Sequence, residues 1–370
     1  MREGWEIKKL GEVCTLFTDG DWIESKDQSD AGIRLIQTGN VGCGIFNDKA
    51  EHYRYISQNT FDRLKCTEIY AGDILISRLP DPIGRSCIIP YLPDRMITAV
   101  DCTIVRLGDD LIPQFLVHYT NSSDYNKKIQ RYVTGAVRKR ISRKNLSQIE
   151  IPIPPLSEQK RIVAELDLLS EVIAKKREQL TQLDALAQSL FYTMFGDPIT
   201  NEKGWETKKF GDCYKLTSGQ GLSAKSILGG EYPVYGGNGI VGYHYSYNLD
   251  GENIIIGRVG ALCGNVRNLI GKVFITDNAF ILTKKIENIN IFLLYLLRLH
   301  NLRKYAREAM QPVISNSGLK NILIILPPLA LQQQFAEKIE AIEQQKERIR
   351  QSLAEVQLLF DSRMDYYFNN

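Results

Sequence analysis

The sequence predicts an α+β protein built as an internal repeat, in which two mixed α/β domains are joined by two long antiparallel coiled-coil helices. Two observations predict this architecture. The segment Gly4–Gly20 (GWEIKKLGEVCTLFTDG) returns as Gly204–Gly221 (GWETKKFGDCYKLTSGQG). The segment Ile141–Gln159 returns as Ile314–Gln332, with a Pro-Pro pair in each copy. A repeat of this size indicates two related units with pseudo-twofold symmetry.

The Pro-Pro pairs and the helix ends predict the domain boundaries. We expect a first domain over residues 1–150 and a first spacer helix over 151–197. A second domain then covers 198–323, and a second spacer helix covers 324–370. The copies differ in length only between the Gly-Trp start and the Pro-Pro end. The domains have therefore diverged, whereas the helices have kept their length.

A long helix is predicted after the first Pro-Pro pair. The segment Ser157–Phe195 contains neither Gly nor Pro, and Gly196-Asp197-Pro198 follows it as a stop signal. Its apolar residues recur at spacings of four and three, which is the heptad pattern of a coiled coil. About 38 residues at 1.5 Å each span about 57 Å. The stripe is Ile162, Leu166, Leu169, Ile173, Leu180, Leu183, Ala187, Leu190 and Met194.

The second long segment carries the same stripe. A helix of this length cannot bury it against its own small domain, so we expect the two helices to pack antiparallel, with the domains at opposite ends. The alternative is that each helix covers only its neighbouring domain. Lys176 and Lys346 interrupt the stripes, either setting the register or reaching to solvent. The second stripe is Phe335, Ile339, Ile342, Ile349, Leu353, Val356 and Phe360.

Inside each domain the pattern predicts a mixture of strands and helices. Short β-rich runs are bounded by Gly, Asp and Pro, and longer runs show helical apolar periodicity. The strands are expected over Ala71–Leu79, Ile97–Leu107, Asp250–Gly260 and Phe274–Lys285. The helices are expected over Ile112–Tyr132 and Asn290–Ala309.

Composition excludes several classes of protein. Hydrophobic residues make up 44% of the 370 residues and charged residues 24%, which is ordinary for a globular protein. We see no signal peptide and no apolar run of about 20 residues, so we expect a cytoplasmic protein outside the membrane. The seven cysteines form no C-x-x-C pair, and the four histidines lie far apart and do not combine with cysteines at zinc-like spacing. We expect reduced thiols and no metal site.

Net charge is only +3, but its distribution is uneven. Between Tyr125 and Ile149 there are eight basic residues and no acidic residue, which is the footprint expected of contacts to nucleic-acid phosphates. The alternative is a solvated helical face. From this region we expect DNA contacts from Thr134, Gly135, Arg138, Lys139, Arg140, Arg143 and Lys144.

Further candidates for DNA contact end the matched strands or lie in loops. Arg78 and Arg258 end the strands, and Arg85 and Arg267 follow in loops; a guanidinium suits guanine or phosphate, although a salt bridge is the alternative for each. Residues 237–242 read G-x-G-x-x-G, but no helix opens after them, so we reject a dinucleotide site. A glycine loop whose backbone can approach DNA closely fits this segment better. Its candidates are Tyr235, Asn238 and Tyr243, unless the tyrosines only pack a hairpin.

Motifs for chemistry are missing from the sequence. Neither Pro-Pro pair has the [DNS]-P-P-[YFW] form of a base methyltransferase, no P-loop occurs, and no nuclease cluster or activated nucleophile is visible. We therefore expect no catalytic residue and no cofactor in this chain.

The duplicated order resembles the specificity (S, HsdS) subunit of type I restriction–modification systems. The resemblance rests on the GWE-KK opening of each half, on VYGGNGIVGY, on the IS…L…I-IPPL-EQ segment and on SLFYTMFGDP. It implies two target-recognition domains that each read one half of a split, asymmetric site on double-stranded DNA. It also implies two methyltransferase (M) subunits docked on the helices, and translocase/nuclease (R) subunits in the full complex.

The resemblance implies further that the chemistry belongs to the partners. The assembled complex would methylate adenine at N6 with S-adenosylmethionine bound by M, and cut DNA with ATP used by R. The second motif, LPPLALQ, departs mildly from PPLSEQ, and we expect helix docking to survive this. The alternatives are a protein-binding scaffold without DNA and a fused enzyme with an unrecognised active site.

Overall fold

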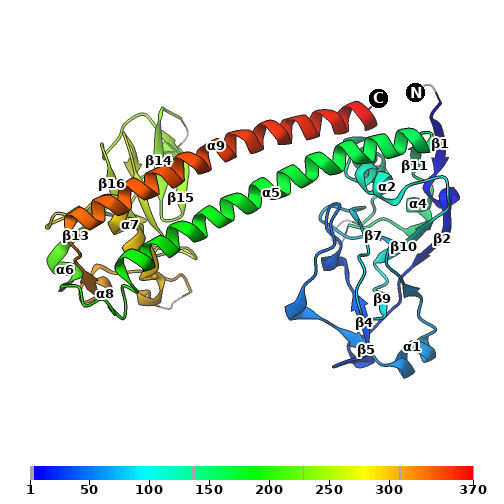
Figure 1. Ribbon diagram of the computed structural model, residues 1–370, viewed down its shortest axis with the longest axis horizontal. Coiled ribbons are helices and arrows are strands. Elements are labelled where there is room, and N and C mark those ends of the chain that lie inside the picture. The colour runs from blue at the N-terminus through cyan, green and yellow to red at the C-terminus, as the bar shows by residue number, and fades with distance from the viewer. Residues whose placement is uncertain (1–3, 136–138, 228, 308–309, 370) are drawn as a thin grey trace. The chain divides into compact units, whose positions relative to one another are not determined.

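The computed structural model describes residues 4–135, 139–227, 229–307 and 310–369. The chain forms two compact units. The first comprises residues 1–175 and 352–370, and the second comprises residues 176–351. Two helices of 40 residues each, α5 (Leu156–Phe195) and α9 (Leu329–Phe368), contribute one segment to each unit (Figure 1).

The first unit is built around an antiparallel sheet of order β2-β10-β7-β8. Alternate side chains point to opposite faces of a strand, and here both faces are buried. Ile74 and Ile76 of β7 pack on the helices, whereas Leu75 between them packs on a second sheet. The strands are β2 (Cys14–Asp19), β7 (Ile74–Ser77), β8 (Ser86–Ile88) and β10 (Cys102–Leu107).

Helices and a two-stranded ribbon cover one face of this sheet, and a five-stranded outer sheet of order β3-β5-β4-β9-β6 covers the other. The helices are α2 (Pro113–Thr120), α3 (Ser123–Gln130) and α4 (Arg143–Ser147). The ribbon pairs β1 (Glu6–Lys9) with β11 (Glu150–Ile153). The outer strands are β3 (Gln28–Ser29), β4 (Ile33–Ile36), β5 (Tyr55–Ile56), β6 (Glu68–Ile69) and β9 (Met96–Thr98), with α1 (Gln58–Leu64) beside them.

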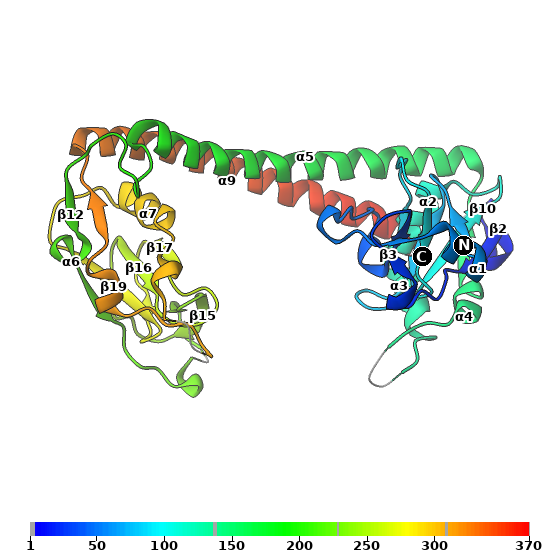
Figure 2. The same cartoon turned by 90° about the horizontal axis from the view of Figure 1, so that it is seen from below.

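The second unit repeats this three-layer frame. Its central sheet has the order β13-β19-β16-β17, its ribbon pairs β12 with β20, and its outer sheet β15-β14-β18 has only three strands. Figure 2 shows α7 between the long helices and the central sheet. The strands are β12 (Thr207–Lys209), β13 (Tyr214–Ser218), β14 (Tyr232–Gly236), β15 (Gly239–His244), β16 (Asn253–Gly257), β17 (Val266–Leu269), β18 (Phe274–Ile275), β19 (Ala279–Lys284) and β20 (Leu323–Ile325). The helices are α6 (Phe210–Cys213), α7 (Asn290–Leu299) and α8 (Asn316–Leu319).

Two strands predicted as single are each split between two layers. The expected strand over residues 97–107 is β9 and β10, and the one over 274–285 is β18 and β19. Between β9 and β10 the chain forms a turn, in which the N–H of Cys102 donates to the carbonyl of Ala99 at 2.9 Å. The single-strand predictions were wrong because the apolar run continues through the turn, while the chain moves from the outer sheet to the central one.

The predicted domain helices are also interrupted. Residues 112–132 form α2 and α3, because the hydroxyl of Ser122 accepts a hydrogen bond from the N–H of Tyr125 and starts a new helix. Helix α7 ends at Leu299, and Asn301 then takes a left-handed conformation with φ of 48°. A 3-10 turn over Leu302–Tyr305 follows. Apolar periodicity runs across both breaks, so it did not reveal them.

A buried glutamine joins each long helix to its domain. The side chain of Gln159 is fully buried; its Oε1 accepts from the N–H of Ile112 at 2.8 Å, and its Nε2 donates to the carbonyls of Asp110 and Pro154, both at 2.8 Å. Gln332 repeats this in the second unit: its Oε1 accepts from the N–H of Ile289 at 3.0 Å. Ile112 and Ile289 precede α2 and α7, so each glutamine binds the start of a domain helix.

The repeated tryptophans attach the Gly-Trp openings to the long helix by different acceptors. The indole Nε1 of Trp5 donates to the carboxylate of Glu158 at 3.0 Å, and the other oxygen of that carboxylate lies 3.6 Å from Arg161. The indole of Trp205 donates instead to the carbonyl of Phe195 at 2.8 Å.

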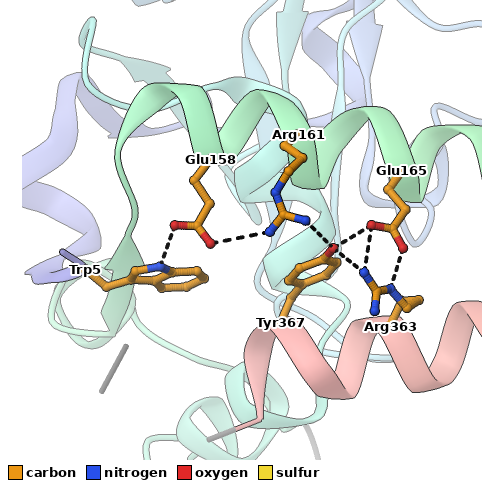
Figure 3. A network of polar contacts seen from close by, with 6 residues as sticks. All are labelled: Trp5, Glu158, Arg161, Glu165, Arg363 and Tyr367. Atoms are coloured by element: carbon orange, nitrogen blue, oxygen red, sulfur yellow. Dashed lines mark hydrogen bonds and ion pairs between the residues drawn. The ribbon is translucent and has the colours of Figure 1, made fainter. Parts of the chain in front are cut away.

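The two long helices pair antiparallel in the first unit. Arg363 of α9 makes a bidentate ion pair with Glu165 of α5. The hydroxyl of Tyr367 donates to Glu165 at 2.5 Å and accepts from Arg161 at 3.3 Å (Figure 3). The hydrogen bond from Arg363 holds the pKa of Glu165 below its usual value. Higher numbers on α9 therefore face lower numbers on α5.

The second unit shows the same antiparallel pairing through apolar contacts and a buried cation. The ring centroids of Phe191 on α5 and Phe335 on α9 lie 5.6 Å apart. Lys346, which interrupts the predicted apolar stripe, is buried, and its Nζ lies 2.6 Å from the carboxylates of Asp184 and Glu343. Asp184 lies on α5, so this lysine contributes to the register between the helices.

Replacing Gln159 by Leu should destabilise the first unit by about 1–3 kcal/mol, because the N–H of Ile112 and two carbonyls would lose their buried partner. Chemical denaturation followed by circular dichroism measures the change. The matched control is Gln333→Leu at an exposed position of α9, which should shift the midpoint by no more than about 0.5 kcal/mol. Equal effects of the two substitutions would contradict the role assigned to Gln159.

Candidate nucleic-acid interface

Arg78 and Arg258 occupy equivalent positions in the two units. The N–H of Arg78 donates to the carbonyl of Asp101, and that of Arg258 donates to Asn278, both at 2.9 Å. The carbonyl of Arg78 accepts from Ile141 at 3.2 Å. In the second unit the carbonyl of Arg258 accepts in the same way from the N–H of Ile314 at 2.9 Å. The two arginines therefore match in backbone pairing as well as in sequence.

Their guanidinium groups have different surroundings. Arg78 is buried; its Nε lies 3.3 Å from the carboxylate of Asp19, and its Nη2 donates to the carbonyl of Val100 at 2.5 Å. Arg258 is half-buried above the ring of Phe280, and its Nη1 donates to the hydroxyl of Ser218 at 3.4 Å. The salt bridge that the sequence left open as an alternative is thus present at Arg78.

Arg85 is surrounded by backbone carbonyls. It is 9% exposed, and its guanidinium donates to the carbonyls of Val41, Thr38, Leu79 and Pro82 at 2.6–2.9 Å. These bonds use most of its donors. The arrangement favours a brace for the loop after β4 over a contact to DNA.

Arg267 holds the corresponding loop of the second unit, although it is not the backbone counterpart of Arg85. The N–H of Ser77 donates to the carbonyl of Arg85, whereas that of Gly257 donates to Asn265, so Asn265 is the counterpart. Arg267 lies two residues further along the chain. It was expected in a loop, but it lies on β17 opposite Ile255. Its Nη2 donates to the carbonyl of Asn238 at 2.7 Å.

The basic region forms a loop and a short helix, not one helical face. Thr134 and Arg140 pair as an antiparallel bridge, with Gly135 at φ of 100° beside it. Arg138 lies outside the described residues. Lys139 and Arg140 are exposed in the loop, and Arg143 and Lys144 are exposed at the start of α4.

A hollow of about 680 Å³ lies beside this region in the first unit. Arg78, Arg143, Lys144 and Lys9 line it, with the carboxylates of Asp19 and Glu12 among them. The sequence brought Arg78 and the basic region forward as separate candidates, and the structure places them on one surface. Lys9 and Asp19 were missed, because both lie far in sequence from Arg78 and from the basic region.

In the second unit the glycine-rich candidates form a hairpin. β14 pairs antiparallel with β15, and the turn between them contains Asn238. A strand, β15, follows the glycines in place of the helix that the dinucleotide fingerprint requires. A Cβ at Gly237 would lie 2.8 Å from the carbonyl of Val259, so a side chain would not fit there. Tyr243 is 48% exposed and Tyr245 78% exposed, whereas Tyr235 is half-buried.

The outer sheet of the first unit carries a second hollow that the sequence did not indicate. It has a volume of about 350 Å³. Three of its side chains, Lys49, His52 and Arg54, are exposed and make no side-chain hydrogen bond or ion pair within the part of the chain that the structure describes. The only signal in the sequence is the Gly-Asn pair at residues 39–40, which recurs as Gly237-Asn238 at the hairpin turn of the second unit. The lining is Gln37, Gly39, Asn40, Lys49, His52, Tyr53 and Arg54.

Neither metal ligands nor membrane spans are found in the described ranges. Over these residues no group of three or more His, Cys, Asp or Glu side chains is arranged to hold a metal ion. A search of the same ranges finds no helix apolar and long enough to cross a bilayer. Burial raises the pKa of the Cys87 thiol to about 12, so this cysteine stays protonated at neutral pH.

A family model described as "Type I restriction modification DNA specificity domain" matches residues 2–184 and 202–358. The chain belongs to this family. The two matches coincide with the repeat, which confirms the resemblance drawn from the sequence. Specificity subunits of type I systems are non-catalytic, and the family assigns recognition of DNA sequence to this chain.

Individual relatives agree with the family. The specificity subunit of type I restriction enzyme EcoprrI from Escherichia coli is 31% identical over 191 residues, which is 49% of this chain and 47% of that subunit. That match therefore spans about half of each protein. The specificity subunit of StySPI from Salmonella potsdam is 24% identical over 390 residues, covering 92% of this chain and 82% of that one.

Solved structures share the fold along the whole chain. The S subunit of a type I system from M. genitalium aligns with a TM-score of 0.61 at 15% identity, covering 99% of this chain and 96% of that one. A chain from a study of type I complex assembly and conformational transition aligns with a TM-score of 0.58 at 19% identity, covering 100% and 98%. The predicted fold class, with two mixed domains and two long helices, is confirmed.

Reversing two charges in the basic loop, Lys139→Glu with Arg140→Glu, should weaken DNA binding about equally for all sequences, because phosphate contacts carry no sequence information. The slope of log K against log[salt] should fall in magnitude by about 2. Fluorescence anisotropy of the assembled complex from 50 to 300 mM salt measures both. The control, Lys160→Glu with Lys175→Glu on α5, makes the same change in net charge. An unchanged slope in the loop variant would rule out the loop as a phosphate contact.

Proposed function

We propose that this chain is the DNA-reading subunit of a type I restriction–modification complex, and that each unit reads one half of a split, asymmetric site on double-stranded DNA. Residues 1–150 and 198–323 are the two reading domains in this proposal. The observation that carries it is the repeated frame with unlike outer sheets. The frame holds equivalent residues at equivalent places, whereas the outer layer has five strands in the first unit and three in the second.

The difference between the outer layers supports an asymmetric site. Side chains that read base edges must differ wherever the two half-sites differ. The candidate side chains do differ: the second unit presents exposed tyrosines on the hairpin β14–β15, and the first presents Lys49, His52 and Arg54 around its outer hollow. Two unlike readers on one frame are suited to two unlike sequences.

We also propose that the long helices set the gap between the half-sites. Each helix has 40 residues, which corresponds to about 60 Å at 1.5 Å per residue. Half-sites read from one side of a duplex lie about one helical turn apart, about 34 Å, or a multiple of it. A helix pair of fixed register would keep this separation constant.

The partners in this proposal are two M subunits docked on the helices and R subunits in the full complex. Exposed apolar side chains on the helices support docking there: Leu168 and Leu358 in the first unit, and Leu186 in the second, are 52–72% exposed. In this proposal the complex methylates adenine at N6 using S-adenosylmethionine bound by M, and cuts DNA using ATP on R. In this proposal neither cofactor binds to this chain.

The methylome of a methylation-free host tests the proposal. The host would express the cognate M subunit with and without this chain, and long-read sequencing would report modified adenines. A split, asymmetric motif appearing only with the chain is the expected result. Association of the two subunits without any methylation motif would contradict DNA reading, and absence of association would favour a protein-binding scaffold.

Lengthening both helices by one heptad should widen the gap and leave the half-site sequences unchanged. Seven residues inserted after Lys175 and seven after Gln351 keep the heptad pattern and add about 10 Å. That corresponds to about three base pairs. The methylome of the variant reads the gap directly, and a variant with the heptad sequences substituted in place, without insertion, is the control. A gap of the original length would refute the ruler role.

A further inference from the structure

One carboxylate in the first unit lies between two guanidinium groups. Asp19, the last residue of β2, lies 3.3 Å from the Nε of Arg78 and 3.9 Å from the Nε of Arg143. Arg78 is 8% exposed, whereas Arg143 is exposed at the start of α4. Asp19 therefore neutralises the inner arginine, and Arg143 is the cation that faces solvent.

In the second unit Ser218 stands where Asp19 stands in the first. Each is the last residue of its strand, and each precedes a glycine packed against the crossing chain: a Cβ at Gly20 would lie 2.4 Å from the carbonyl of Thr98, and one at Gly219 would lie 2.4 Å from that of Thr276. A carboxylate is thereby replaced by a neutral hydroxyl.

Asn316 stands where Arg143 stands in the first unit. Ser142 caps α4 by accepting from the N–H of Asn145, and Ser315 caps α8 by accepting from the N–H of Gly318. Arg143 and Asn316 are the residues that follow these caps. The second unit therefore lacks both the carboxylate and the outer guanidinium.

Arg258 is left as the only charged member of the second group. Its Nε is buried and has no hydrogen-bond partner among the described residues. Its one side-chain hydrogen bond in that set goes to Ser218, and no carboxylate of the described ranges lies within ion-pair distance. Half-buried over Phe280, the guanidinium is held in place, and no carboxylate of the described ranges neutralises it.

The two groups carry the same net charge on different residues. Arg78, Arg143 and Asp19 are two cations and one anion, which leaves one net positive charge; Arg258 with neutral Ser218 and Asn316 also leaves one. We propose that each group binds one DNA phosphate, through Arg143 in the first unit and through Arg258 in the second. In the first unit Asp19 pairs with Arg78, and in the second unit the phosphate pairs with the equivalent arginine, Arg258. This inference rests on the proposed reading of DNA.

The chemistry of the groups suits a phosphate diester. Guanidinium–phosphate pairs are charge-assisted and can use two parallel N–H donors. The hydroxyl of Ser218 adds a donor beside Arg258. In the first unit the 680 Å³ hollow that contains Arg78, Arg143 and Asp19 offers room for a backbone phosphate.

Substitutions at the two exchanged positions test the inference in opposite directions. In the assembled complex with its methyltransferase subunits, Ser218→Asp should lower the magnitude of the slope of log K against log[salt] by about 0.9, because one phosphate contact is lost. Asp19→Asn should raise it by about 0.9, because Arg78 becomes free to pair with a phosphate. Ser218→Asn has nearly the same shape as Ser218→Asp without the charge, and should leave the slope unchanged.

Single methylphosphonate substitutions along both strands of the cognate site would locate the phosphates. In the wild-type complex one neutralised phosphate in each half-site should weaken binding about tenfold, and in Ser218→Asp the one in the second half-site should no longer matter. Gain of a contact in Asp19→Asn does not result from misfolding, so it tests the idea even if Ser218→Asp folds poorly.

Two results would overturn the inference. Equal losses in Ser218→Asp and Ser218→Asn with an unchanged slope would show that Ser218 acts through shape. The second result is that the methylation motif of the Ser218→Asp variant is relaxed at one base pair while its salt slope equals that of the wild type. This would show that Arg258 reads a base. In either case the wild-type complex would still bind and methylate its own site, which separates this failure from failure of the proposed function.

Discussion

The architecture of each unit depends on a buried glutamine amide. Apolar contacts between a helix and a domain tolerate rotation and sliding, whereas an amide that must satisfy one N–H and one or two carbonyls allows a single placement. Gln159 and Gln332 impose that placement where each long helix begins. The contacts further along each helix depend on this placement, including the ion pair of Arg363 with Glu165 and that of Lys346 with Asp184.

The sequence predicted most reliably what is periodic or repeated. The first long helix was expected over Ser157–Phe195 and is found over Leu156–Phe195. The second spacer helix was expected from residue 324, and its helix begins at Leu329. The repeat predicted two similar units. Sequence patterns failed where they continue across a break in the structure. The apolar run continues through the turn before Cys102, and the helical pattern continues through Ser122 and Asn301. Turns of this kind depend on which sheet the next strand joins, and a local window does not contain that information.

The candidate site was predicted by residue type but not by environment. Arginines were singled out by their charge, and Arg78 and Arg258 were matched correctly. Their different surroundings come from Asp19 and Ser218, which lie at least 40 residues away in sequence and carry no motif. Arg85 was an equally good candidate in the sequence, but its guanidinium donates to four backbone carbonyls. Long-range partners decide which cations remain available, and one sequence does not reveal them.

The division of the chain has a consequence for its synthesis. Met364, Tyr367 and Phe368 lie in the hydrophobic core of the first unit, yet they leave the ribosome after the whole second unit. The second unit is one continuous segment and has its complete core as soon as residue 351 emerges. Domains generally fold as units during translation, the earlier one first. Here the order is inverted: the first unit can close only after the second, and until then its exposed apolar surface needs protection from aggregation.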